Sequence, residues 1–352
     1  MRKALRLAKR GAGYTSPNPM VGAVVVKDGE VIAQGYHRKF GDLHAEAQAI
    51  RRGGEKVRHS TMYVNLEPCS HFGKTPPCVD EIVKSGISKV VVSMIDPNPL
   101  VTGSGIEMLR RKGVEVQVGL LSSEAERLNE AYLKHTTKHE PFITMKAAIT
   151  LDGMIADSHG NSKWISCEKS RRLVHRLRSG MDSVLVGIDT VLTDDPELTV
   201  RMVKSRRNPL RILLDTHLRV PLDAKILNAS APTLVVTATK GDKHDDLKQI
   251  GVSVWLVEQD RDGRIDLKSF LRRAGVEGIT SILVEGGRGV YSAFLRQRLV
   301  DKFYVFIAPR LLGAGIHLSD QLNIRSIEDS LTLNTASLRK LDSDILITAY
   351  PK

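Results

Sequence analysis

The chain has 352 residues, enough for about two domains, and 52 Lys and Arg against 40 Asp and Glu give it a formal net charge of +12. Hydrophobic residues make up 41% of it, which argues against a disordered chain, and no apolar run approaches the roughly 20 residues of a membrane-spanning helix. Because three cysteines are too few for a disulfide framework and charges interrupt the first ten residues too often for a signal peptide, we expect a cytoplasmic protein.

The first 120 residues alternate strands and helices, which is typical of a layered α/β domain. A strand at 21–26 leads into Lys27-Asp28-Gly29-Glu30, and the Asp-Gly pair predicts a tight hairpin to a second strand at 31–33. Further along, the pattern predicts helices at 44–52, 77–85 and 104–112 and strands at 61–66 and 89–94.

A domain boundary is predicted after this alternating region. Residues 121–140 are polar and helix-prone and end at Glu140-Pro141, so we interpret them as a connecting helix between a domain at 1–120 and a second one at 141–352. The second domain contains short apolar runs, which are typical of buried strands in an α/β fold. These predicted strands are 142–146, 183–187, 210–215, 233–237, 252–257, 281–285, 302–308 and 344–348.

The clearest chemical pattern is His44-Ala45-Glu46 followed by Pro68-Cys69 and by Cys78. Imidazole and thiolate are zinc ligands, and three of them leave the fourth position of a tetrahedral site open for water. Zinc makes bound water more acidic, and a deaminase also needs a carboxylate that is not a ligand to transfer protons. We therefore predict His44, Cys69 and Cys78 as ligands and Glu46 as the catalytic carboxylate. Because residues two apart point to different sides of a helix, His44 and Glu46 have to lie at its first turn.

Three other interpretations fit the same residues. Zinc deaminases that act on RNA share the His-x-Glu and Pro-Cys pattern, although two residues usually separate their cysteines and here eight do. Such an RNA adenosine or cytidine deaminase with an accessory domain would use the positive charge to bind nucleic acid, but aromatic residues for base stacking are only 5%. A non-enzymatic basic zinc-binding module would need a fourth protein ligand. A two-domain enzyme with one inactive domain is the third possibility.

Longer runs around these residues resemble the bifunctional riboflavin biosynthesis family RibD, whose own variant of the cysteine spacing is the long one. The resemblance covers nearly the whole chain and implies an α/β fold, with an N-terminal cytidine-deaminase-like three-layer domain and a C-terminal dihydrofolate-reductase-like domain. The runs that carry it are Ser16-Pro17-Asn18-Pro19-Met20-Val21-Gly22, 67–78, Asp96-Pro97-Asn98-Pro99, 146–153, Lys163-Trp164-Ile165-Ser166, 190–196 and Val284-Glu285-Gly286-Gly287.

The resemblance also implies two reactions. Zn²⁺ would serve the hydrolytic deamination of 2,5-diamino-6-ribosylamino-4(3H)-pyrimidinone 5′-phosphate, and NADPH would then reduce the ribosyl group of the product to ribityl. Phosphorylated aminopyrimidines would account for the positive charge, so we expect neither nucleic acid nor a membrane as a partner, and we expect a homo-oligomer. The implied deaminase substrate-binding residues are Asn18, His37, His71, Lys74, Asp96 and Asn98. A turn-forming residue is the alternative for Asn18, and a solvated strand end is the alternative for His37.

In the second domain the resemblance places Lys146 as a catalytic residue beside the nicotinamide. Glu285-Gly286-Gly287-Arg288-Gly289 follows an apolar strand and opens a helical pattern, where backbone N–H groups can approach a phosphate, with an ordinary strand-to-helix turn as the alternative, and the resemblance makes it a loop for the cofactor pyrophosphate. Core packing is the alternative for Trp164, and a solvated surface charge is the alternative for Arg178 and Arg201. Cys167 is expected to be a core thiol. The implied reductase substrate-binding residues are Ser162, Arg178, Leu198, Arg201 and Glu285, and the implied cofactor-binding residues are Ala148, Trp164, Thr190, Asp194, Thr216, Gly286, Gly287, Arg288 and Gly289.

Overall fold

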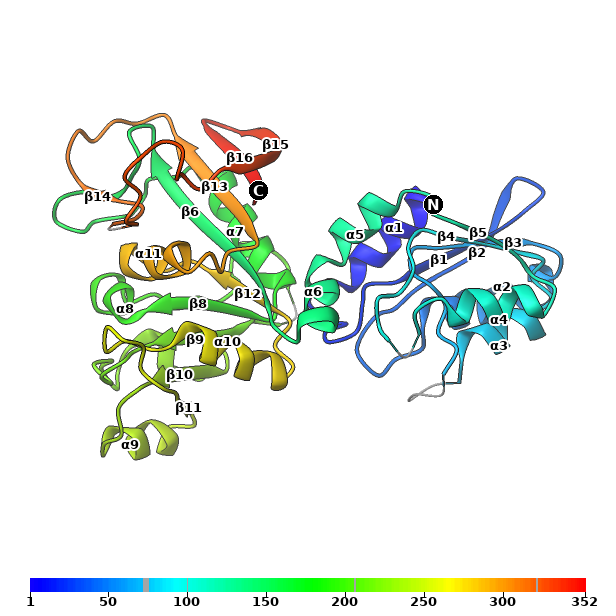
Figure 1. Ribbon diagram of the computed structural model, residues 1–352, viewed down its shortest axis with the longest axis horizontal. Helices are drawn as coiled ribbons and strands as arrows, with labels where there is room; N and C mark the ends of the chain where they lie inside the picture. Colours follow the sequence, from blue (N-terminus) through cyan, green and yellow to red (C-terminus); the bar gives the residue numbers. More distant parts are fainter. Residues whose placement is uncertain (72–75, 100, 206, 321) are drawn as a thin grey trace. The chain divides into compact units, whose positions relative to one another are not determined.

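The structure is a computed structural model that describes residues 1–71, 76–99, 101–205, 207–320 and 322–352 (Figure 1). The chain forms two compact units, Met1–His139 and Glu140–Lys352. The segment that the sequence suggests as a connector, 121–140, is therefore grouped almost entirely with the first unit. None of the helices in the described ranges has the length and apolar character that a membrane crossing requires.

The first unit is built on a five-stranded sheet with the order β2-β1-β3-β4-β5. Its strands β1 and β2 form the predicted hairpin, since Asp28 and Gly29 adopt φ angles of 50° and 81° as a primed turn requires. β1 is antiparallel to β3, and β3, β4 and β5 run parallel. The strands are β1 (Gly22–Lys27), β2 (Glu30–Tyr36), β3 (Thr61–Val64), β4 (Lys89–Val92) and β5 (Glu115–Val118).

Helices cover both faces of this sheet, which confirms the predicted three-layer domain (Figure 1). α2, α3 and α4 pack on one face, and α1 and α5 lie on the other. α2 approaches β2 so closely that a Cβ at Gly35 would lie 2.2 Å from the Ala45 carbonyl oxygen, so this glycine fixes where the helix begins. The helices are α1 (Arg2–Ala8), α2 (Ala45–Gly53), α3 (Cys78–Lys84), α4 (Ser104–Arg111), α5 (Ser122–Leu128) and α6 (Glu130–Lys138), and 3-10 turns span Lys9–Gly11 and Gly54–Val57.

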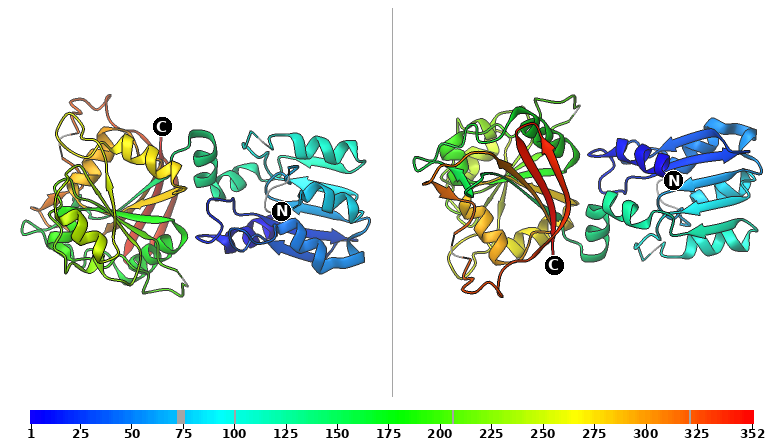
Figure 2. Two further views of the ribbon diagram at one scale, coloured as in Figure 1. Left: turned by 90° about the horizontal axis from the view of Figure 1, so that it is seen from below. Right: turned by 90° about the horizontal axis from the view of Figure 1, so that it is seen from above.

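The second unit contains a nine-stranded sheet with the order β11-β10-β9-β8-β12-β6-β13-β16-β15. Its strands run parallel from β11 to β13, and β16 and β15 complete it as antiparallel strands, drawn side by side in red in Figure 2. β7 and β14 pair separately. The strands are β6 (Phe142–Thr150), β7 (Met154–Ala156), β8 (Ser183–Gly187), β9 (Leu210–Leu214), β10 (Thr233–Thr237), β11 (Ser253–Leu256), β12 (Ser281–Val284), β13 (Lys302–Ala308), β14 (Ile316–His317), β15 (Leu333–Leu341) and β16 (Asp344–Pro351).

Both faces of the parallel region are buried, which explains why its strands appear in the sequence as continuous apolar runs. Phe270 of α10 and Phe294 of α11 pack in the core on one face, and Val191 of α8 and Leu247 of α9 pack in the core on the other. β8 continues directly into α8, and β12 leads into α11 after three residues. Open α/β sheets bind ligands at such strand ends. The helices are α7 (Glu168–Gly180), α8 (Ile188–Asp194), α9 (Lys243–Gln249), α10 (Leu267–Val276) and α11 (Arg288–Arg296), with a 3-10 turn at Lys225–Leu227.

Candidate functional sites

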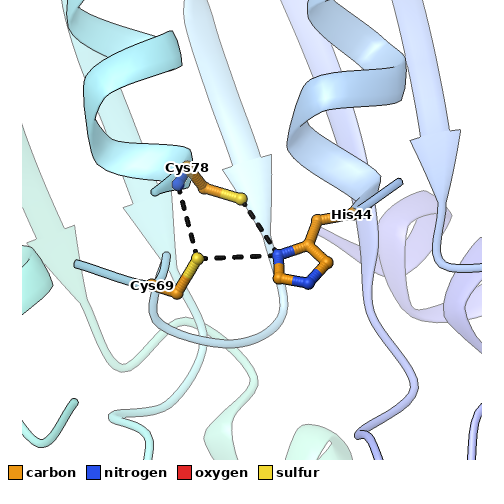
Figure 3. Close-up of side chains that lie close together, drawn as sticks. All are labelled: His44, Cys69 and Cys78. Carbon is orange, nitrogen blue, oxygen red and sulfur yellow. Dashed lines mark hydrogen bonds between the residues drawn. The ribbon is translucent and has the colours of Figure 1, made fainter. Parts of the chain in front are cut away.

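His44, Cys69 and Cys78 converge in the first unit (Figure 3). His44 immediately precedes α2, Cys78 is the first residue of α3, and Cys69 lies in the loop after β3. His44 Nδ1 lies 3.2 Å from the Cys78 sulfur and 3.5 Å from the Cys69 sulfur. In a tetrahedral zinc site the bond to nitrogen is ~2.0 Å long and the bond to sulfur ~2.3 Å. A nitrogen ligand and a sulfur ligand of one zinc ion are then about 3.6 Å apart. The three side chains therefore suit a zinc ion in both chemistry and spacing.

Of the two thiols, Cys69 is the one placed to hold negative charge, because the hydrogen bond that the Cys78 thiol donates to it, together with burial, raises the pKa of Cys78. A hydrogen bond from the Cys78 thiol holds the pKa of Cys69 well below its usual range, and the Cys78 backbone N–H also donates to the Cys69 sulfur over 3.3 Å. Thiolate is the form of cysteine that binds metals. Within the described ranges, no fourth His, Cys, Asp or Glu joins the cluster. This donor set resembles a catalytic zinc site more than a closed structural one.

Glu46 is placed beside the cluster by the helix start that also places His44. It is the second residue of α2, its side chain is 3% exposed, and its Oε2 has no hydrogen-bond partner among the described residues. Burial raises the pKa of Glu46 to about 7. A carboxyl group with a pKa near neutrality both accepts and releases protons readily.

His37 links the predicted substrate loop to the cluster. Its Nδ1–H donates to the Leu43 carbonyl over 3.3 Å, which leaves Nε2 as the acceptor for the Asn18 side-chain amide at 3.4 Å. The His37 ring packs edge-on against His44, with 5.6 Å between ring centroids. Because His37 is only 2% exposed, the interpretation of this residue as a solvated strand end is wrong.

The remaining predicted deaminase residues lie beyond β3 and β4. Asp96 is buried, and its Oδ1 accepts hydrogen bonds from the Asn98 backbone N–H at 2.9 Å and from the Tyr132 hydroxyl at 2.8 Å. His71 is exposed at the end of a described range, and Lys74 lies outside the described residues. The structure thus brings Asn18, His37, Glu46 and the metal cluster together, and it fixes Asp96 through contacts that sequence reasoning missed.

Glu67 is one residue whose role the sequence did not reveal, although it belongs to a quoted run. Its buried carboxylate accepts four backbone N–H groups: those of Asp96 and Gly103 on Oε2, and those of Gly105 and Ile106 on Oε1. A Cβ at Gly105 would lie 2.1 Å from the Pro68 carbonyl oxygen. The start of α4 and the Asp96 loop are therefore fastened directly to the loop that carries Cys69.

We expect Cys78→Ser to lose bound zinc, because a serine hydroxyl is a much weaker zinc ligand than a thiolate. Elemental analysis of the purified variant measures this. Cys167→Ser is the matched control, since Cys167 lies in the second unit, where its thiol donates to the Leu341 carbonyl, and this variant should keep its zinc. Full zinc occupancy in Cys78→Ser would show that Cys78 is not a ligand.

The second unit has a cleft of about 1040 Å³ at the carboxyl ends of its parallel strands, large enough for a dinucleotide and a second ligand. Trp164 is 61% exposed there, so core packing is the wrong interpretation of it. Two predicted cofactor residues do not line the cleft: the Thr216 carbonyl accepts hydrogen bonds from residues 237–239, and Gly286 lies against the backbone of Val186. The predicted residues that line the cleft are Lys146, Ala148, Ser162, Trp164, Arg178, Thr190, Asp194, Leu198, Arg201, Glu285, Gly287, Arg288 and Gly289.

Three charged side chains meet at the inner end of this cleft. Glu285 accepts two hydrogen bonds from Arg178, Nε to Oε1 at 2.6 Å and Nη2 to Oε2 at 3.0 Å, and Lys146 Nζ lies 3.9 Å from Oε2. Burial alone would raise the pKa of Glu285, but Arg178 and then Lys146 outweigh burial and lower it. Burial also lowers the pKa of Lys146. Two cations share one carboxylate, so the cluster favours an anionic ligand.

His175 of α7 is a further cleft residue that sequence reasoning missed. Burial, followed by the nearby Arg178 and Arg201, lowers the pKa of His175 to about 4, so its ring is neutral at neutral pH. Its Nδ1 accepts a hydrogen bond from the Arg201 backbone N–H at 3.1 Å. The Arg201 guanidinium is half-exposed and bonds to Glu197 and Thr199. Arg201 is thus neither a free surface charge nor a buried one.

Larger residues would not fit at the two glycines before α11. A Cβ at Gly286 would lie 2.5 Å from the Val186 Cα, and a Cβ at Gly287, whose φ is 37°, would lie 2.8 Å from the Thr190 hydroxyl oxygen. The backbone therefore comes unusually close to β8 and α8 before the helix begins. The free N–H groups of a helix start suit a phosphate group. These residues fit the pyrophosphate of a nicotinamide dinucleotide.

We expect Gly286→Ala to weaken NADPH binding about tenfold or more. The added methyl group meets backbone atoms of β8 that cannot move aside as a side-chain end would, so the loop that carries Gly287 has to shift away from its binding position, at a cost of about 1–3 kcal/mol. Fluorescence titration of the cofactor measures the effect. Gly180→Ala is the control because a Cβ there meets no atom within 4 Å. Unchanged NADPH affinity in Gly286→Ala would contradict the assignment of this loop.

Comparisons with known proteins agree with both sites. Residues 141–347 match the RibD C-terminal domain, and residues 1–94 match the cytidine and deoxycytidylate deaminase zinc-binding region. The chain is 47% identical to riboflavin biosynthesis protein RibD of Aquifex aeolicus (strain VF5), over 99% of this chain and 96% of the relative. It is 38% identical to RibD of Escherichia coli (strain K12), over 99% of this chain and 97% of the relative.

Solved structures give the same result over the whole chain. A diaminohydroxyphosphoribosylaminopyrimidine deaminase/5-amino-6-(5-phosphoribosylamino)uracil reductase from Thermotoga maritima superposes with a TM-score of 0.90 at 38% identity, covering 100% of this chain and 97% of that one. Acinetobacter baumannii RibD, form 1, gives a TM-score of 0.90 at 36% identity with the same coverage.

Fold, sites and matches together define a two-domain enzyme, a zinc-dependent deaminase joined to an NADPH-dependent reductase. The chain belongs to the RibD family and is a bifunctional enzyme of riboflavin biosynthesis. The predicted family, fold class, enzyme class and cofactors are thereby confirmed. The RNA deaminase and the non-enzymatic zinc module are set aside, since neither accounts for the reductase half of the chain.

Proposed function

We propose that the first unit removes the 2-amino group of 2,5-diamino-6-ribosylamino-4(3H)-pyrimidinone 5′-phosphate by hydrolysis and that the second unit reduces the ribosyl group of the product to ribityl. The observation that carries the proposal is the buried carboxylate of Glu46, whose Oε2 has no hydrogen-bond partner among the described residues, beside a His, Cys and Cys cluster. The name of the Thermotoga maritima relative, which specifies a deaminase and a reductase of these pyrimidines, supports the choice of substrate.

In the deaminase, His44, Cys69 and Cys78 would hold the zinc ion, which makes a bound water more acidic. Glu46 takes a proton from the attacking water and delivers it to the departing amino group, which leaves as ammonia. Asn18 presents an amide that both donates and accepts hydrogen bonds, as the edge of a pyrimidine requires. His37 keeps that amide in place through the hydrogen bond between Asn18 Nδ2 and His37 Nε2.

In the reductase, NADPH supplies the hydride. Lys146 lies at the inner end of the cleft, where its ammonium group stabilises developing negative charge or hands over a proton. Glu285 holds Arg178 and faces Lys146, so it sets the charge balance at this point. Arg201 and Arg178 would bind the substrate phosphate, with Ser162 and Leu198 beside them, and the remaining predicted cleft residues would bind the cofactor.

The setting of the enzyme is also part of the proposal. We infer a cytoplasmic homo-oligomer that binds phosphorylated aminopyrimidines and not nucleic acid. The small number of cysteines supports a reducing compartment. The inner charge cluster, with two cations against one carboxylate, supports small anionic ligands as the reason for the net charge of +12.

One assay tests both activities. The purified chain receives the diaminopyrimidine phosphate and NADPH, and ammonia release and NADPH absorbance are followed together. Ammonia release followed by NADPH consumption is the expected result. Absence of ammonia would refute the deaminase, and ammonia without NADPH consumption would refute the reductase. Added tRNA should neither bind nor change these rates if nucleic acid is not a partner.

A further inference from the structure

The side chain of Asn129, which lies between α5 and α6, is buried in the first unit. It is 2% exposed, its Oδ1 accepts the Met20 backbone N–H at 2.8 Å, and its Nδ2 donates to the Met20 carbonyl at 3.0 Å. One amide side chain thus occupies both backbone groups of a single residue, as a neighbouring strand would. Asn65 donates to the same Met20 carbonyl at 2.9 Å and accepts the Gly22 N–H at 2.7 Å. The backbone that follows Asn18 is therefore held from two sides.

Tyr132, three residues later on α6, reaches the other side of the same site. Its hydroxyl donates to Asp96 Oδ1 at 2.8 Å, the oxygen that also accepts the Asn98 N–H. Asp96 is buried, and no Lys or Arg forms an ion pair with it among the described residues. A hydroxyl donor that fixes one carboxylate oxygen sets the direction in which the carboxylate can accept the N–H groups of an aminopyrimidine.

The helices α5 and α6, which flank Asn129 and carry Tyr132, pack against the core of the first unit, so both side chains are held in fixed positions. Ala125 of α5 is fully buried against Leu66 and Met94, which follow β3 and β4, and Tyr132 and Leu133 pack on this cluster. The loops that carry Cys69 and Asp96 also begin at these two strand ends. A passive linker would be exposed and would have few such contacts.

We propose that Asn129 and Tyr132 are positioning residues of the deaminase: Asn129 fixes Met20 and so places Asn18, and Tyr132 orients Asp96 toward the pyrimidine. The inference rests on the proposed function of the first unit. It gives the segment that carries Asn129 and Tyr132 a share in substrate recognition through the residues that it holds in place.

Tyr132→Phe in the full chain is the main test, because it removes one hydroxyl and keeps the ring that packs on Ala125. We expect the KM for the diaminopyrimidine phosphate to rise about tenfold, as for a lost hydrogen bond to a charged group, with a smaller change in kcat. Zinc content and reduction of the deaminated pyrimidine should equal those of the wild type. Thr137→Ala is the control, because among the described residues its hydroxyl bonds only to carbonyls of its own helix, and it should change neither KM nor kcat.

A double-mutant cycle separates positioning from general loosening of the fold. If Tyr132 acts through Asp96, Tyr132→Phe should add little to the defect of Asp96→Asn, whereas independent effects multiply. An unchanged KM in Tyr132→Phe, a parallel loss of reductase activity, or multiplicative effects in the cycle would overturn the role of Tyr132.

Asn129→Ala supplies a readout that needs no substrate. We expect faster hydrogen exchange of the Met20 amide, which loses its acceptor, together with a raised KM for the pyrimidine. Exchange at Met20 as slow as in the wild type would overturn the role of Asn129. Ammonia release by the wild type tests the proposed function separately, so failure of that function and failure of the positioning role give different results.

Discussion

Glu46→Gln should stop ammonia release while leaving zinc binding and reduction intact. The amide has nearly the shape of the carboxylate but cannot take a proton from water, and a positioned acid–base group contributes roughly 10²–10⁴-fold to rate. Glu46 is buried beside the cluster, and its Oε2 has no hydrogen-bond partner among the described residues, so this oxygen is available to take up the proton. Ammonia release, measured with the diaminopyrimidine phosphate, should therefore fall by at least about a hundredfold.

Two controls make this result specific to Glu46. Elemental analysis should find zinc as in the wild type, since no ligand is changed, and the variant should still reduce deaminated pyrimidine with NADPH. Glu55→Gln removes an exposed carboxylate just beyond α2 and should leave the deaminase unchanged. If Glu46→Gln turned over at the wild-type rate with full zinc, the proton-transfer role would be wrong.

The second large effect is expected for Glu285→Gln in the reductase. Both oxygens of Glu285 bind Arg178, and Lys146 lies near one of them, so the neutral amide leaves two nearly buried cations without their counter-charge. Breaking a buried ion pair in this way costs about 3–5 kcal/mol. We expect unfolding of the second unit at a clearly lower denaturant concentration, and loss of most NADPH consumption.

The stability difference between the wild type and Glu285→Gln should depend on pH in a direction that the pKa of Glu285 sets. The pKa of Glu285 is lower in the folded chain than in the unfolded chain. The ionised carboxylate therefore stabilises the fold fully at pH values above the pKa of the unfolded chain, and this contribution is lost as the pH falls through the pKa of the folded chain. The stability gap between wild type and Glu285→Gln should therefore narrow in acid. Glu168→Gln, which removes an exposed partner of Arg172, should cost under about 1 kcal/mol. An equal loss in the free energy of unfolding for the two variants would show that the buried charge cluster stabilises the second unit no more than an exposed ion pair does.

Features that depend on short-range patterns could be predicted from the sequence. The Asp28-Gly29 turn needs two positive φ angles, and the buried parallel strands have continuous apolar runs, so both were located within a few residues. The position of His44 and Glu46 at a helix start followed from helical periodicity together with the requirement that both face one metal site. β15 was not predicted, because it is mostly exposed and paired only with β16, so no apolar alternation marks it.

Contacts between distant residues could not be predicted. Arg178 and Glu285 are 107 positions apart, and Asn129 and Met20 are 109 apart, so nothing in the local pattern connects them. Residues 121–140 were interpreted as a connector because their composition is polar, yet one buried asparagine and one tyrosine hydroxyl tie them to the first unit.

Glu67 has a consequence for attempts to give this enzyme a new heterocycle. Its carboxylate accepts hydrogen bonds from four backbone N–H groups in the stretch between β4 and the first turn of α4. Glu67 itself lies two residues before Cys69. Insertions or deletions in that stretch would pull on the zinc ligand as well as on the pocket, so they would damage turnover before they altered selectivity. Redesign should therefore keep this backbone unchanged and vary side chains outside that stretch, beginning with Asn18.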